Sequence, residues 1–268
     1  ITDNDLYVSK VNDRYYTSGV FLTFSYLSES KNDQLEKRIL EWQIGHEMFT
    51  PYKSIVEDIS EHDRPFAAYL YGSFGINRLY KNNSNFKTTL QIGIIGSNAF
   101  GKELQDFIHD IYGFNKAVGW KHQIKNAFDI SWVNSGKIGT IYSNISTGFY
   151  GRIGFKPLQK LANSIAFNTS INNKKTNYVR EVETFIYIKP MLRYAFYDAT
   201  LQGSFLNKNS EVTNELVPLV FNLEVGLRFT ANRFNFGYVY NYNSNKSKNL
   251  RYDNGQPYGS ILINYLLR

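Results

Sequence analysis

The stretch Val217–Phe229, VPLVFNLEVGLRF, carries an apolar residue at every second position over 13 residues. Alternation with a period of two predicts a β-strand that has one apolar and one polar face. The polar face includes both Glu224 and Arg228. An ordinary strand has about 5–6 residues, whereas crossing a bilayer takes about 9–11 tilted residues. The stretch is therefore long enough to cross a membrane.

The same alternation recurs along the chain, for example in the aromatic series from Phe234 to Tyr242. Connections rich in Asn, Lys and Ser separate many of these segments and are typical of turns and loops. We expect about 12 strands, an even number that such barrels allow. They lie near residues 2–9, 16–27, 38–50, 64–77, 85–96, 126–134, 139–154, 161–169, 179–198, 214–230, 232–243 and 257–268.

Two all-β architectures place alternating faces differently. In a soluble sandwich the apolar faces form a core, whereas in a transmembrane barrel they meet lipid and the polar faces line the lumen. Acidic and basic residues share single polar faces, and tyrosine and phenylalanine crowd the strand ends as in an interfacial aromatic belt. The sequence therefore predicts one domain over residues 1–268, a single antiparallel transmembrane β-barrel.

Composition limits the alternatives. The chain has 30 Lys and Arg against 23 Asp and Glu, a net charge of +7 that favours anionic partners. It has no cysteine, which excludes disulfides and thiolate zinc sites. Aromatic residues make up 16% of it. The basic residues form no stripe or recognised module, so we expect no nucleic-acid partner.

One segment departs from the strand pattern. In GKELQDFIHDIYG, residues 101–113, apolar residues recur at helical spacing, and Gly113 is placed to end a helix. We expect a short helical insertion near 102–113. A second stripe on it carries Gln105, His109 and Tyr112. Taken alone, a histidine on such a stripe is more often structural than catalytic.

Three further stretches contain polar groups that suit chemistry. In NDRYYTSG, residues 12–19, Thr17 shares a polar face with Gly19, so we expect its hydroxyl in the lumen. In TDND, residues 2–5, carboxylate and amide oxygens alternate, as a hard cation such as calcium prefers. In HDRPFAAYLY, residues 62–71, Asp63 and Arg64 could form an ion pair at a strand end.

These motifs together resemble a known family, the calcium-dependent outer-membrane lipid A 3′-O-deacylases. The terminal strand GSILINYLLR also resembles the segment by which outer-membrane barrels are recognised for assembly, although Arg268 follows where a final Phe is typical. The deacylase motifs occur in order as Asn4-Asp5, Asp13–Gly19, Phe49-Thr50-Pro51, Asp63–Tyr71, Gln105 and His109 with Gly119-Trp120 and Gln123, and Leu201-Gln202-Gly203 with Phe205.

The resemblance implies roles for individual residues. His109 would be the general base that activates water against an ester carbonyl, and Gln105 would orient the substrate or the histidine. Asn4, Asp5 and Thr17 match positions that the family needs for activity, and their oxygens suit calcium. A family glutamate is replaced by Asn115, a weaker candidate ligand. Asp63, Arg64, Trp120 and Gln123 would bind substrate.

By the same resemblance the chain is expected in the bacterial outer membrane, as a monomer among outer-membrane lipids, acting on the lipid A of lipopolysaccharide. An outer-membrane phospholipase is an alternative, but no G-x-S-x-G motif is present. A non-catalytic barrel, such as a porin or adhesin, is another. It predicts that His109, Thr17 and Asp5 are scattered around the barrel.

Overall fold

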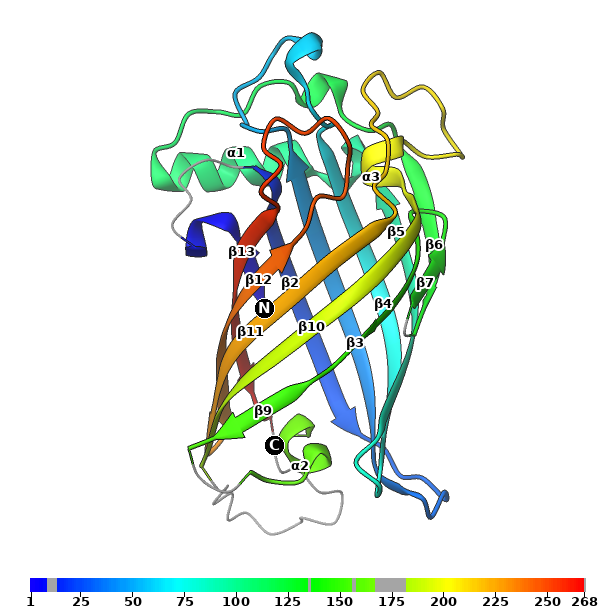
Figure 1. Ribbon diagram of the computed structural model, residues 1–268, viewed down its shortest axis with the longest axis vertical. Helices are drawn as coiled ribbons and strands as arrows, with labels where there is room; N and C mark the ends of the chain where they lie inside the picture. The colour runs from blue at the N-terminus through cyan, green and yellow to red at the C-terminus, as the bar shows by residue number, and fades with distance from the viewer. Residues whose placement is uncertain (9–13, 135, 156–157, 167–181, 268) are drawn as a thin grey trace.

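The computed structural model describes residues 1–8, 14–134, 136–155, 158–166 and 182–267. All strands found there belong to one antiparallel sheet (Figure 1). The strands are β1 Thr2–Asn4, β2 Tyr15–Leu27, β3 Leu35–Thr50, β4 Ala67–Tyr80, β5 Asn85–Ile95, β6 Ala127–Val133, β7 Gly136–Gly139, β8 Tyr142–Gly148, β9 Gly151–Gly154, β10 Glu183–Asp198, β11 Leu219–Ala231, β12 Phe234–Asn243 and β13 Gln256–Tyr265.

The sheet closes into a barrel, and its N-terminal and C-terminal strands lie side by side in the ring. The short strand β1 pairs with β13 on one side and with β2 on the other. On the far side of the ring, β10 pairs with β11 along almost its whole length. Closure gives each strand a hydrogen-bonding neighbour on both sides, which is needed because hydrocarbon offers no partners for backbone N–H and carbonyl groups. The predicted antiparallel barrel is therefore confirmed.

The 13 strands of the described residues occupy 12 positions in the wall, because β8 and β9 pair with successive parts of β10. Pro190 of β10 faces the break between them. It has no N–H to donate, and the Phe149 N–H donates to its carbonyl at 3.1 Å. The expected strand 139–154 is thus interrupted at this proline, and Gly136–Gly139 forms a strand of its own.

The apolar faces point outward along the barrel. On β11, Leu219, Phe221, Leu227 and Phe229 are exposed. The alternating Asn222, Gly226 and Thr230 are buried towards the lumen. A soluble sandwich would show the reverse arrangement. The belt of exposed apolar side chains is the surface expected of a transmembrane barrel.

Two expected strands are wrong in part. Residues 161–165 form helix α2, with residues 167–169 outside the described part of the chain. Ala162 and Ala166 lie on one side of this turn and pack on Ile39 and Leu79 inside the barrel. The expected strand 2–9 stops at Asn4, because the Asn4 side chain accepts the Leu6 N–H at 2.7 Å and turns the backbone.

Helices and long connections gather at one end of the barrel, where α1 and α3 lie (Figure 1). Short turns and α2 lie at the other. No helix of the described residues has the length and apolar character to cross a membrane. The helices are α1 Gly101–Tyr112, α2 Leu161–Ile165 and α3 Ala199–Gln202, with 3-10 turns η1 Asp5–Val8, η2 Ile59–Glu61, η3 Ser97–Ala99 and η4 Trp120–His122.

The outward apolar face predicts opposite effects for two substitutions on β2. Leu22 is 75% exposed on the outer face, so Leu22→Arg should lower the free energy of unfolding in lipid by about 2–4 kcal/mol. Ser25 pairs with Glu41 on the lumen face, so Ser25→Arg should cost much less. Denaturant unfolding in liposomes measures both. Equal losses would contradict the assigned faces.

Candidate functional site

Helix α1 is fixed to the outside of the barrel wall at its first residue. A Cβ atom on Gly101 would lie 2.4 Å from the Cβ of Ala68 on β4, so only glycine allows this close approach. Just before the helix, the Ala99 carbonyl lies 2.7 Å from Nε2 of His46 on β3. Gly113 ends the helix with φ of 71°, and its N–H donates to the His109 carbonyl. The predicted helix is confirmed.

The polar stripe of α1 faces the protein and its apolar face points outward. Gln105 and His109 are 2% and 5% exposed, whereas Phe107 and Ile111 are both 62% exposed. A surface helix in water shows the opposite arrangement. Tyr112, expected on the polar stripe, is exposed and stacks on Phe114. Phe107 and Ile111 therefore continue the apolar belt of the barrel, while Lys102, Glu103 and Asp110 are also exposed on the helix.

Trp120 holds Gln105 in place. Its indole Nε1–H donates to Oε1 of Gln105 at 2.8 Å, and both side chains are buried. The indole ring packs on the ring of Phe66 at 5.0 Å. Gly119 precedes it with φ of 101°, which a residue with a side chain rarely adopts. These contacts make Trp120 a positioning residue for the α1 stripe.

His109 is oriented by a backbone group. Its Nδ1 lies 2.5 Å from the carbonyl oxygen of Asn115. Since a carbonyl only accepts hydrogen bonds, Nδ1 carries the proton and Nε2 is the basic nitrogen. The Asn115 residue is exposed, so its carbonyl, and not its amide, serves the histidine. Residue 115 can therefore change its side chain without removing this contact.

The expected position of Thr17 in the lumen is wrong. The β2–β3 register shifts between Tyr16 and Ser18, which makes Thr17 the extra residue of a β-bulge. Its hydroxyl lies 2.8 Å from that of Thr50. Phe49 lines the lumen, so Thr50, the next residue along β3, faces outward. The bulge therefore turns Thr17 to the outer surface, on the same side of the wall as α1.

Asn4 and Asp5 lie beside this outer surface. Asn4 pairs with Ser18 and Asp3 with Gly19. Because Asp3 lines the lumen, Asn4 points outward. Asp5 opens the next turn, is 2% exposed and accepts the Arg14 N–H at 2.9 Å. Asp13, the first residue of the Asp13–Gly19 motif, lies outside the described residues.

The helix is long enough to bring its stripe to these residues. From Gly101 at β4, α1 runs towards the edge of the barrel that carries η1 (Figure 1). Eight residues of helix cover about 12 Å, and the two strand spacings from β4 to β2 cover about 10 Å. These lengths are sufficient for the α1 stripe to reach β2, the strand that carries Thr17.

Asp63 and Arg64 have a different environment. Arg64 is 2% exposed, donates to the Thr200 carbonyl at 3.2 Å and lies over the ring of Phe49. Burial lowers its pKa to about 10, so it stays charged at neutral pH. Asp63 accepts the Tyr15 hydroxyl at 2.7 Å. The expected ion pair between the two is not formed, and both side chains hold loops together above the lumen.

Asp63 also accepts the backbone N–H groups of Tyr52 and Arg251, each at 2.9 Å. Gln123 is half-buried, and its side-chain carbonyl has no hydrogen-bond partner among the described residues. Of the four expected substrate-binding residues, Trp120 is the one that contacts the α1 stripe within the described residues. Thr50, which contacts Thr17, was not predicted as a site residue from the sequence, although it belongs to the Phe49-Thr50-Pro51 motif.

Comparison with known proteins identifies a family and a solved structure that are similar to this chain. The family model described as outer membrane protein LpxR matches residues 1–133 and 125–267. The solved structure of LpxR from Salmonella typhimurium superposes with a TM-score of 0.76 at 19% sequence identity. The superposition covers 99% of this chain and 98% of the other and shows the same fold. No curated protein sequence is matched.

The Trp120 contact predicts a local loss of stability. Trp120→Phe removes the donor to Gln105 and should lower the free energy of local opening of α1 by about 1–2 kcal/mol. Amide hydrogen exchange in α1 should therefore be faster in the variant than in the parent chain, while exchange in β11 should be the same in both. Trp132→Phe is the matched control, since Trp132 is 54% exposed on the outer face. Unchanged exchange in Trp120→Phe would contradict the positioning role.

Proposed function

Since the chain belongs to the family of outer membrane protein LpxR and is a lipid A deacylase, we propose that His109 activates the water that hydrolyses the 3′-acyloxyacyl ester. The observation that carries this mechanism is the buried imidazole whose Nδ1 is held by the Asn115 carbonyl at 2.5 Å. A fixed tautomer with Nε2 as the basic nitrogen is what a general base needs.

In this mechanism His109 Nε2 takes a proton from water as the oxygen attacks the ester carbonyl, and the imidazolium then protonates the leaving alkoxide. The carbonyl of Asn115 stabilises the imidazolium through its short contact with Nδ1. Gln105, one turn earlier on the helix and held by Trp120, orients the ester. Because the side chains of His109 and Gln105 are buried and held by hydrogen bonds, they lose little conformational entropy on reaching the transition state.

The outer surface around α1 suits a lipid substrate. Phe107 and Ile111 extend the apolar belt to the end of the barrel that carries the long connections. An acyl chain of a lipid in the outer leaflet can therefore lie against this belt while its ester reaches the inner face of α1. The belt surrounds one chain, and we propose that a monomer is the working unit.

The oxygen donors on the wall fit a loosely held calcium ion. Asp5 contributes a carboxylate, and Asn4 and Thr17 contribute an amide and a hydroxyl oxygen. The described residues contain no group of three or more His, Asp or Glu side chains that could hold a metal. Calcium takes 6–8 oxygens, so water and lipid oxygens would complete the shell. When bound, calcium would polarise the ester carbonyl and stabilise the oxyanion.

The distribution of these residues supports an enzyme over a porin or adhesin. His109, Thr17 and Asp5 come from α1, β2 and η1, all at the same end of the barrel (Figure 1). A non-catalytic barrel would have no reason to bury a histidine and a glutamine on the inner face of a helix whose outer face exposes Phe107 and Ile111. An outer-membrane phospholipase would cleave glycerophospholipids, which the experiments below include as a control substrate.

Two substitutions separate the side chain from the backbone contact. His109→Ala should reduce deacylation by about 10²–10⁴-fold, the typical contribution of a general base. Asn115→Ala should retain activity within a few fold, because the carbonyl that holds Nδ1 belongs to the backbone. The readout is loss of one acyloxyacyl unit from lipopolysaccharide by mass spectrometry, with glycerophospholipid hydrolysis followed in parallel.

Full activity of His109→Ala would overturn the proposed base. A loss in Asn115→Ala as large as that in His109→Ala would show that the amide of residue 115 is itself required. Cleavage of glycerophospholipid and not of lipid A would favour the phospholipase alternative. Electrophoretic mobility of the unheated barrel checks that each variant has folded.

The calcium proposal predicts a shift in metal requirement. EDTA should abolish activity, and added calcium should restore it. Asp5→Asn removes the one carboxylate among the proposed donors and should raise the half-saturating calcium concentration at least tenfold. Asn115→Glu should lower it if that side chain reaches the ion. Activity that is unaffected by EDTA would contradict a role for calcium.

A further inference from the structure

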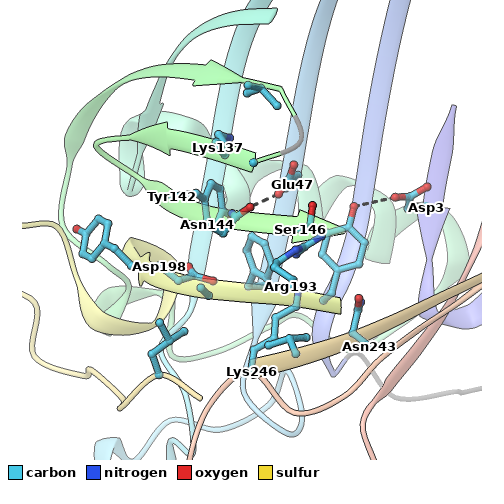
Figure 2. A pocket seen from close by; sticks show the side chains of 18 of the residues that line it. Asp3, Glu47, Lys137, Tyr142, Asn144, Ser146, Arg193, Asp198, Asn243 and Lys246 are labelled. Atoms are coloured by element: carbon cyan, nitrogen blue, oxygen red, sulfur yellow. Dashed lines mark hydrogen bonds between the residues drawn. The ribbon is translucent and has the colours of Figure 1, made fainter. Parts of the chain in front are cut away.

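The lumen contains a cavity that the deacylase site does not use. It has a volume of about 410 Å³ and is lined by residues from the ends of β3 and β10, the start of β2 and the connection after β12. Figure 2 shows Arg193 near its centre with Lys246 below it. A pocket of this size can hold a small polar molecule.

The cavity and the α1 site lie on opposite faces of the same wall. Tyr16 and Phe49 line the cavity, whereas their sequence neighbours Thr17 and Thr50 meet on the outer face. A ligand in the cavity would therefore contact none of the residues proposed for ester hydrolysis. Changes inside the cavity can be tested separately from changes in the α1 site.

Three basic side chains elsewhere in the barrel are matched by carboxylates. Lys189 on β10 pairs with Glu224 on β11 at 2.9 Å, and Lys87 on β5 pairs with Glu41 on β3. Nearer α2, Arg152 lies 3.7 Å from Glu183. Such pairing is expected, because an uncompensated charge in a confined space costs free energy.

Arg193 and Lys246 have no such partner. Neither side chain forms a hydrogen bond or an ion pair within the described residues, and the Nε atom of Arg193 is buried without a partner. The third cation of the cavity, Lys137, lies 4.5 Å from the ring centre of Tyr142. The Tyr142 hydroxyl in turn donates to Glu47 at 3.5 Å.

The other two carboxylates of the cavity are engaged by nearby donors. Asp3 accepts the Tyr16 hydroxyl at 2.9 Å. Asp198 accepts the backbone N–H of Thr200 at 2.9 Å and its hydroxyl at 2.6 Å. The acids of the cavity thus have donors, while two of its cations lack acceptors.

We propose that Arg193 and Lys246 form a binding site for a phosphate-bearing small molecule in the lumen. A guanidinium offers a planar fork of donors that suits a phosphate group, and a lysine adds a point charge. Asn144, Ser146 and Asn243 also line the cavity and suit hydroxyl groups of an attached sugar. The phosphate group could belong to a soluble molecule or to a lipid headgroup.

The environment of Lys246 agrees with this assignment. Burial, and next the charge of Arg193, lower the pKa of Lys246 to about 8, while Asp198 and Glu47 act in the opposite direction and Arg64 adds to the lowering. Two cations close enough to disfavour each other's charge gain from an anion between them.

The test measures phosphate binding by the whole folded barrel. The chain is purified in non-ionic detergent without phosphate and titrated calorimetrically with inorganic phosphate. R193Q and K246Q should each weaken binding at least tenfold, the effect of losing a charged hydrogen bond. K189Q is the matched control, because Lys189 already has Glu224 as its partner, and should bind as the parent chain does.

Lipopolysaccharide is then added to the phosphate-bound protein. Displacement of phosphate would identify a lipid headgroup as the source of the anion, and no displacement would identify a soluble one. Absence of saturable phosphate binding at millimolar concentration, or equal binding by R193Q and the parent chain, would overturn the proposal. The phosphate titration involves no ester cleavage, so its result is independent of the proposed hydrolysis.

Discussion

Closure of the strand ring is the constraint on which the rest of this structure depends. In hydrocarbon a backbone N–H or carbonyl finds no water, so each strand needs a neighbour on both sides. The three-residue strand β1 provides this between β13 and β2. By doing so it also places Asn4 on the outer face and Asp5 at the start of η1. The ring and the proposed deacylase site thus share the short strand β1.

The wall of the barrel serves two environments because side chains alternate across it. Regular alternation would have left Thr17 with the lumen face. One extra residue at the β2 bulge moves it to the outer face, where it meets Thr50. The bulge therefore separates the lipid-facing chemistry from the polar cavity with Arg193. The cavity and the Thr17–Thr50 contact use adjacent residues of β2 and β3, yet they lie on opposite faces of the wall.

Helix α1 follows the polarity of the barrel and not that of a soluble protein. Its apolar residues face outward and continue the belt, while Gln105 and His109 face the wall. The contacts that hold it come from small residues and loops: Gly101 against Ala68, and Trp120 from the following connection. Such a helix can present a base to an ester without leaving the lipid surface.

The sequence by itself determined the barrel, its approximate strands, the α1 helix and the family, because side-chain period and short motifs are local properties. It could not determine the break at Pro190, the helical turn at 161–165 or the outward position of Thr17. Each depends on a partner distant in sequence: β9 on β10, Ala162 on Ile39, and Thr17 on Thr50. The loop-holding roles of Asp63 and Arg64, and the lack of partners for Arg193 and Lys246, were likewise decided only by the tertiary structure. Hydrogen bonds and charge pairing depend on which side chains closure brings together, and no local pattern records that.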